Sequence, residues 1–145
     1  MVPQNLVDQK LFTFFLTQEI HKATRLQYPL CVLCLAPDLS RREITSTLID
    51  RLARVSITQL RATDLVARLD TSGVALLLID AKTRNLTAIL ARVKGDLEAV
   101  PGLTLSGGGG CYPQTATSGS ELFEQAVNLM TRAKADGGNR FYLPS

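Results

Sequence analysis

The sequence predicts a single α/β domain, in which helices cover a mixed central sheet of about five strands. Helix-like and strand-like segments follow one another in the order α-β-α-β-β-α-β-α-β. Residues 30–36 (LCVLCLA) form a continuous apolar run, which is typical of a strand buried on both faces. Two strand-like segments, 64–69 and 74–79, are joined by the turn residues Asp70-Thr71-Ser72-Gly73, which predicts an antiparallel hairpin.

Length and composition exclude several classes of protein. The chain has 145 residues, 46% of them hydrophobic and 20% charged, which is usual for one folded domain rather than a disordered segment. Its net charge of +3 is too weak to indicate binding to a nucleic acid polymer. The apolar runs, 30–36 and 74–79, are too short for direct membrane insertion. With 3 cysteines and no signal-peptide pattern, we expect a cytoplasmic protein without a disulfide framework.

The helices follow from apolar residues at helical spacing. In residues 6–26 the apolar stripe includes Phe12, Leu16 and Ile20, and Tyr28-Pro29 ends this helix. We expect residues 1–28 to be an N-terminal helix or linker that packs on a domain formed by 29–145. Three further helices are predicted, at residues 40–60, at 83–100 and, after a cap at Ser118 or Ser120, at 121–135.

The remaining strands are short. Residues 103–106 predict a strand that runs into four glycines, Gly107–Gly110, which we interpret as a strand end and flexible loop rather than a phosphate cradle. Residues 140–143 predict a last strand. Cys31 and Cys34 would point to opposite faces of their strand and so cannot share a metal; Cys111 is expected to be an ordinary thiol.

Four segments in the correct order resemble the GGDEF domain family, the diguanylate cyclase fold. They are FLTQEIHKATRLQYPLCVLCL (15–35), LRATDLVARL (60–69), LTLSGGG (103–109) and AVNLMTRAKADGGNRF (126–141). Together they cover nearly the whole chain. The resemblance implies a nucleotidyl cyclase-like sheet with an antiparallel hairpin. It also implies a bacterial signalling protein concerned with cyclic di-GMP.

The residues that would hold metal depart from the family pattern. The glycine-rich turn of the family corresponds here to Asp70-Thr71-Ser72-Gly73-Val74, so that Gly73 replaces the metal-binding Glu. The first Asp of the family's Asp-x-Asp is Ala36, and only the second, Asp38, is kept. Magnesium sites for phosphoryl transfer depend on such carboxylates. We therefore expect no metal, no cofactor and no diguanylate cyclase activity.

Two nucleotide-binding elements of the family are also altered. The guanine-reading stretch that should follow Asp38 is absent, and the segment 38–61 is several residues shorter than is usual. Gly138 stands where the family has a triphosphate-binding Arg, although Lys134 remains. An active cyclase, or a protein that binds GTP without turnover, is therefore disfavoured.

In contrast, Arg61-Ala62-Thr63-Asp64 matches the family's Arg-x-x-Asp inhibitory site, the RxxD site, which binds cyclic di-GMP. It lies at the family's spacing before the altered turn, and ungapped counting adds Arg92 from the next helix. A guanidinium can donate two parallel hydrogen bonds to guanine or phosphate, and a carboxylate can accept from guanine N–H groups. The alternative is a surface ion pair without function.

The resemblance implies a catalytically inactive cyclic di-GMP receptor, which a stacked ligand dimer could link into a homodimer. Its other partners would be domains or proteins of a bacterial signalling or secretion complex. By analogy these include the cellulose and Pel exopolysaccharide systems. The alternative is a nucleotide-independent interaction or dimerisation module, suggested by apolar residues of the first helix (Phe12, Phe14, Phe15 and Leu16).

Overall fold

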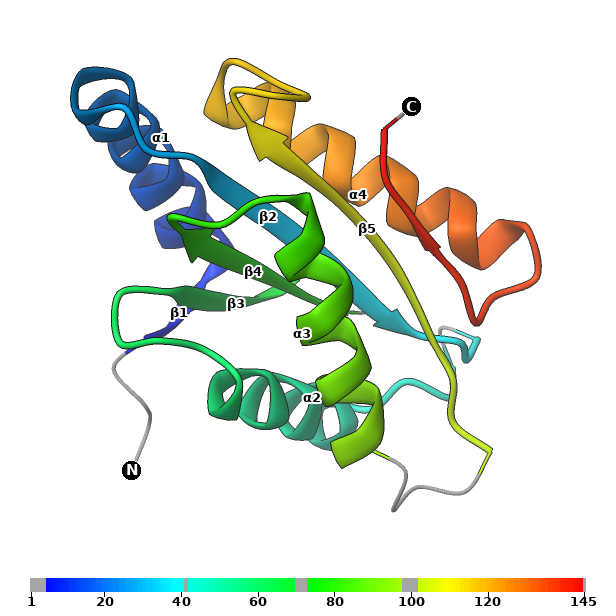
Figure 1. The fold of residues 1–145 in the computed structure, drawn as a ribbon. Helices are drawn as coiled ribbons and strands as arrows, with labels where there is room; N and C mark the ends of the chain where they lie inside the picture. The colour runs from blue at the N-terminus through cyan, green and yellow to red at the C-terminus, as the bar shows by residue number, and fades with distance from the viewer. Residues whose placement is uncertain (1–4, 41, 70–72, 98–101, 145) are drawn as a thin grey trace.

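The sheet has six strands in the order β1-β3-β4-β2-β5-β6, in a computed structural model that describes residues 5–40, 42–69, 73–97 and 102–144 (Figure 1). The strands are β1 (Leu6–Asp8), β2 (Leu30–Pro37), β3 (Leu65–Leu69), β4 (Gly73–Ile79), β5 (Leu105–Tyr112) and β6 (Phe141–Tyr142). The helices are α1 (Gln9–Leu26), α2 (Ser46–Thr58), α3 (Thr83–Asp96) and α4 (Gly119–Ala135). The predicted mixed sheet covered by helices is thus confirmed.

The central strand is β2, as its apolar sequence predicts. All eight of its residues are buried, and it pairs antiparallel with β4 on one side and β5 on the other. The predicted hairpin of β3 and β4 is present, with Leu69 opposite Gly73. The predicted turn residues 70–72 lie outside the described residues.

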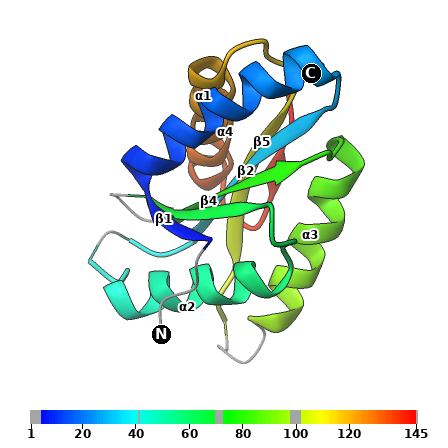
Figure 2. The same ribbon diagram turned by 90° about the vertical axis from the view of Figure 1, so that its left-hand side faces the viewer.

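Each face of the sheet carries a pair of helices. Helices α1 and α4 cover one face and α2 and α3 the other, as the two views show (Figures 1 and 2). Side chains of β2 alternate between the two cores: Cys31 and Leu33 pack toward α2 and α3, whereas Val32 and Cys34 pack toward α1 and α4. This alternation confirms that Cys31 and Cys34 lie on opposite faces.

The start of the chain differs from the predicted helix over 6–26. Residues Leu6–Asp8 form β1, which pairs parallel with β3, and α1 begins at Gln9. The side chain of Asp8 accepts a hydrogen bond of 2.7 Å from the Leu11 backbone N–H, which caps the helix. The division into residues 1–28 and 29–145 remains a prediction, although α1 supplies four buried side chains to the core.

The prediction of a flexible loop at the glycine run is wrong, because Gly107–Gly110 form the middle of β5 and are buried. The reason is the close approach of α4. A Cβ atom at Gly108 would lie 2.3 Å from the backbone nitrogen of Met130 and 2.5 Å from the carbonyl oxygen of Ala126. Glycine is therefore needed to let the helix backbone contact the strand.

The prediction that Cys111 is an ordinary thiol is also wrong. Cys31 and Cys111 are directly opposite each other in the β2–β5 pairing and form a disulfide, with an S–S distance of 2.01 Å. Cys34 is a free, buried thiol. Sequence reasoning did not establish which strand pairs with β2, and without that pairing the two cysteines could not be placed together.

Other element boundaries shift by a few residues. Helix α2 begins at Ser46, six residues later than predicted, because Thr45 caps it by accepting a bond of 3.1 Å from Leu48 N–H. Ile49 then points into the core. Ser118, one of the two predicted caps, is the cap of α4. Within the residues described, no helix is both long enough and apolar enough to cross a membrane.

Candidate functional site

The RxxD segment forms a tight turn between the end of α2 and the start of β3. The backbone N–H of Asp64 donates to the carbonyl oxygen of Arg61 at 3.0 Å. In return, the Asp64 side-chain Oδ2 accepts from the Arg61 N–H at 3.0 Å. The carboxylate thus closes the turn on itself, as short acidic side chains do in turns.

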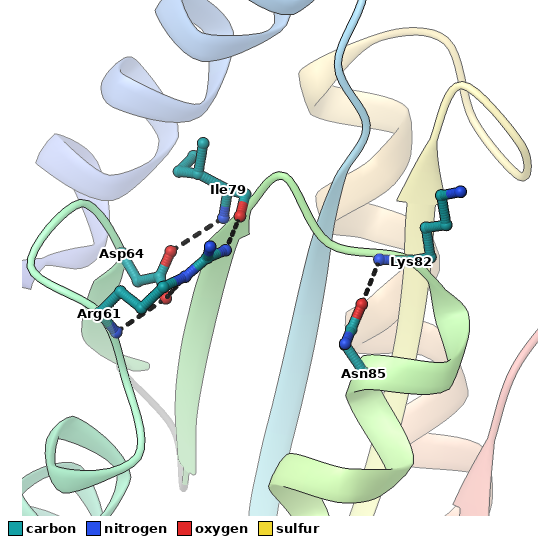
Figure 3. Close-up of polar contacts among 5 residues, drawn as sticks. All are labelled: Arg61, Asp64, Ile79, Lys82 and Asn85. Atoms are coloured by element: carbon teal, nitrogen blue, oxygen red, sulfur yellow. Dashed lines mark hydrogen bonds and ion pairs between the residues drawn. The ribbon is translucent and has the colours of Figure 1, made fainter.

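Asp64 is also tied to the end of the neighbouring strand. Its Oδ1 accepts a bond of 2.9 Å from the backbone N–H of Ile79, the last residue of β4 (Figure 3). The residue is only 3% exposed. An ionised carboxylate offers about four acceptor positions, and these two bonds occupy two of them. Asp64 is therefore first of all a structural link between the turn and β4.

The Arg61 side chain lies over this link and faces solvent. Its Nη2 donates to the carbonyl oxygen of Ile79, and its Nε lies 3.8 Å from Asp64 Oδ2 (Figure 3). The side chain remains 61% exposed. Because a guanidinium has five N–H donors, Arg61 is anchored and still has donors directed at solvent. The structure thus brings Arg61 and Asp64 together.

Arg92 does not contact either of them. It is exposed on α3 and, within the described part of the chain, has no hydrogen bond or ion pair. It lies four residues before Asp96, whose carboxylate accepts a bond of 2.7 Å from the Gln59 side chain just after α2. Residues four apart share a helix face, so Arg92 lies on the face of α3 that meets the end of α2.

The Ile79 backbone is the participant that the sequence does not reveal. Both its N–H and its carbonyl oxygen bind the RxxD side chains. Backbone groups leave no residue-type signal in a sequence. Only the predicted hairpin, which places the end of β4 beside the start of β3, could have indicated this contact.

At the opposite end of β2 lie the positions where the family resemblance implies metal ligands. Ala36 and Gly73 are close to each other there: a Cβ atom at Gly73 would lie 3.3 Å from the Ala36 Cα and 2.2 Å from the Leu35 carbonyl oxygen. Neither residue has a side-chain oxygen. The residues present do not fit a magnesium ion held by two carboxylates. Among the described residues, no three His, Cys, Asp or Glu side chains gather where they could hold a metal.

The remaining carboxylate, Asp38, is bonded to two other segments of the chain. It accepts hydrogen bonds from the hydroxyls of Thr104 and Ser106 and, at 2.7 Å, from the backbone N–H of Asn139. Its own N–H donates to the Thr104 carbonyl oxygen at 2.9 Å. Asp38 therefore joins the end of β2 to β5 and to the loop after α4.

In that loop, Gly138 stands at the position where the family resemblance implies a phosphate-binding Arg. Gly138 has a φ of +76°, and a Cβ atom there would lie 2.8–2.9 Å from the Asp38 carboxyl group. Lys134 lines a pocket of about 230 Å³ with mostly apolar walls, among them Ala36, Leu69 and Met130. This volume is below the range of roughly 300–1,000 Å³ that is typical of small-molecule sites. Lys134 is thus a cationic residue in a small, mostly apolar pocket.

Solved structures with the same fold are GGDEF domains. The GGDEF domain of YfiN (TpbB) from Pseudomonas aeruginosa is 25% identical with a TM-score of 0.84, and the alignment covers 97% of each chain. The GGDEF domain of DgcB from Caulobacter crescentus, solved in complex with c-di-GMP, is 18% identical with a TM-score of 0.82, covering 96% of this chain and 91% of that one. An active GGEEF domain of a diguanylate cyclase from Vibrio cholerae is 14% identical with a TM-score of 0.79, covering 97% of each.

This chain therefore has the GGDEF, or nucleotidyl cyclase-like, fold. By sequence alone, no family profile matches it, and no curated protein does so either. The fold is thus shared with these domains at sequence identities of 14–25%.

Proposed function

We propose that this chain is a GGDEF-like receptor that binds cyclic di-GMP at Arg61, Asp64 and Arg92 and does not synthesise it. The observation that carries the proposal is the Arg61 guanidinium, which is anchored by Ile79 and Asp64 yet 61% exposed. Anchoring lowers the entropy lost when a ligand binds, and the exposed N–H donors suit guanine or phosphate oxygens. That the similar DgcB domain was solved with c-di-GMP supports the choice of ligand.

The three residues have different parts in this proposal. Arg61 donates paired hydrogen bonds to guanine O6 and N7, or to a phosphate, and Arg92 neutralises phosphate charge. Asp64 holds the turn and has two acceptor positions left, but at 3% exposure it reaches a guanine N–H only if the Arg61 side chain moves aside. Substitutions of Arg61 and Arg92 therefore test the proposed ligand contacts more directly than a substitution of Asp64.

Titration calorimetry with cyclic di-GMP tests the proposal. Arg61→Ala and Arg92→Ala should each weaken binding by about 5- to 150-fold, which corresponds to the roughly 1–3 kcal/mol of a good guanidinium contact. Arg25→Ala is the matched control, because Arg25 is an exposed arginine on α1 that makes no contact with the RxxD turn. Absence of heat at tens of micromolar ligand, or equal binding by Arg61→Ala, would contradict the proposal.

The lack of catalysis is tested separately. The proposal rests on Ala36 and Gly73, which offer no metal ligand, and on Asp38, whose oxygens are already bonded. Incubation with GTP and Mg²⁺ should yield no cyclic di-GMP by chromatography, whereas an active GGDEF domain assayed in parallel should. Formation of product would overturn this part and leave the binding proposal standing.

Binding would act through association. Because an intercalated cyclic di-GMP dimer presents four guanines, one ligand unit can bridge two RxxD sites. We propose a ligand-linked homodimer, or contact with domains or proteins of a signalling or secretion complex such as those for cellulose or Pel exopolysaccharide. Sedimentation velocity with and without the ligand should show a shift toward dimer that Arg61→Ala abolishes.

A second candidate function is a nucleotide-independent interaction module. Apolar side chains on α1 support it, since Phe14 is 57% exposed and Leu11, one turn earlier, is 42% exposed. Under this alternative, the protein dimerises with rising concentration whether or not nucleotide is present. Phe14→Ser would then abolish the dimer, and Arg61→Ala would have no effect on it.

A further inference from the structure

We propose a second ligand site, which takes an aromatic or heteroaromatic ring that carries a carboxylate or phosphate. It lies where α1 ends, β2 begins and β5 ends, and it uses none of the residues assigned to cyclic di-GMP. The proposal therefore goes beyond the receptor function and stands independently of it.

The site is a surface pocket of about 370 Å³, inside the range of roughly 300–1,000 Å³ usual for small-molecule sites. Two tyrosine–proline pairs, Tyr28-Pro29 and Tyr112-Pro113, form much of its wall, and the last turn of α1 and one lysine complete it. The lining residues are Ala23, Thr24, Gln27, Tyr28, Pro29, Lys82, Tyr112 and Pro113.

Both tyrosines are held in place by hydrogen bonds. The Tyr28 hydroxyl donates to Glu19 Oε2 at 2.9 Å, and the Tyr112 hydroxyl is 2.5 Å from Thr24 Oγ1. Each ring is half-buried. Rings fixed in this way lose little conformational entropy on binding, and offset or edge-to-face contact with a further aromatic ring is favourable.

Lys82 gives the pocket its charge. It is exposed, and among the described residues its ammonium group has no ion pair or hydrogen bond. Asn85 Oδ1 accepts from the Lys82 backbone N–H at 2.8 Å, which fixes the start of α3, and the side chain extends away from Arg61 and Asp64 (Figure 3). The first turn of α3 contains no acidic residue to complement the helix dipole.

Aromatic walls and an unpaired cation together favour one class of occupant. A neutral apolar ligand would leave the Lys82 charge unused, and a simple inorganic anion would leave the tyrosine and proline surfaces exposed. A ring bearing an anionic group satisfies both. A proline-rich peptide could also contact tyrosine and proline surfaces. It would not depend on Lys82, and this distinguishes the two occupants.

The experiment uses backbone amide NMR of the full chain with three probes at equal millimolar concentration: phenyl phosphate, benzyl alcohol and inorganic phosphate. Phenyl phosphate should shift the amide signals of Tyr28, Lys82 and Tyr112, and each of the other two probes should shift them much less. Lys82→Gln should weaken phenyl phosphate binding about fivefold, as expected for one solvent-exposed ionic contact. Lys10→Gln, a change at an exposed lysine on α1 away from the pocket, should not weaken it.

Tyr112→Phe provides a second variant that keeps the ring and removes only the hydroxyl bond to Thr24. It should bind more weakly than the wild type and more strongly than Lys82→Gln. The proposal is overturned if phenyl phosphate shifts no pocket signal or if it binds Lys82→Gln and the wild type equally. It is also overturned if a proline-rich peptide shifts the same signals with no dependence on Lys82.

Discussion

Replacing Asp64 by alanine should destabilise the fold far more than replacing Arg61, although both belong to the same proposed site. The Asp64 carboxylate accepts from Arg61 N–H at 3.0 Å and from Ile79 N–H at 2.9 Å, and the residue is 3% exposed. Hydrogen bonds to a charged group contribute roughly 1.5–3 kcal/mol each, so the two bonds amount to about 3–6 kcal/mol. In Asp64→Ala, water that reaches the turn beneath the exposed Arg61 side chain would replace part of the lost hydrogen bonding, so we expect the free energy of unfolding to fall by about 2–4 kcal/mol.

Urea unfolding followed by circular dichroism measures this difference. Arg61→Ala should lower the free energy of unfolding by about 1 kcal/mol or less, because the ion pair of Arg61 is solvent-exposed. Asp64→Asn should fall between the two, since it keeps one acceptor oxygen and places an NH₂ group toward a backbone N–H. If Asp64→Ala were no less stable than Arg61→Ala, the carboxylate would not be the structural link that its contacts indicate.

Three further predictions concern the fold. In urea unfolding, Gly108→Ala should lower the free energy of unfolding by several kcal/mol, because its Cβ would collide with the α4 backbone. Gly95→Ala in helix α3, where an added Cβ would have no atom within 4 Å, should instead raise it by about 0.5–1 kcal/mol. Equal effects of the two substitutions would contradict this explanation. Burial and the hydrogen bond to Glu19 raise the pKa of Tyr28 from 10.0 to about 12, so absorbance titration should show a late phenol that Tyr28→Phe removes. In the unfolded state the Tyr28 pKa is taken as the ordinary 10.0. Because the pKa is higher in the folded state, the protonated Tyr28 phenol stabilises the fold fully below pH 10.0, and this stabilisation is lost as the pH rises through about 12. Burial also raises the pKa of the Cys34 thiol, so iodoacetamide should label it only after denaturation; rapid labelling of the native protein would show that the side chain is accessible.

The sequence predicts the elements that depend on local patterns. The apolar run of β2, the hairpin of β3 and β4, and the Ser118 cap of α4 all lie where periodicity and capping chemistry place them. The GGDEF fold is predicted from the resemblance of four segments, in the same order, to that family, and the comparison with solved GGDEF domains agrees.

What the sequence does not predict depends on tertiary contacts. Gly107–Gly110 have the composition of a loop, and only the nearby α4 backbone explains why glycine forms a buried strand there. The disulfide of Cys31 and Cys111 likewise depends on the β2–β5 register. At the candidate site, sequence spacing identified Arg61 and Asp64 as neighbours. The burial of the carboxylate and the part of Ile79 followed only from the three-dimensional contacts.

Gly73 and Gly138 also restrict the substitutions that this protein can tolerate. A side chain at position 73 would collide with the Leu35 carbonyl oxygen, and one at position 138 would collide with the Asp38 carboxyl group. A glutamate at position 73 or an arginine at position 138 would have to displace the backbone or break the bonds of Asp38. Each of these substitutions is therefore expected to give a less stable protein, so a side chain at either position is difficult to introduce by single point mutations.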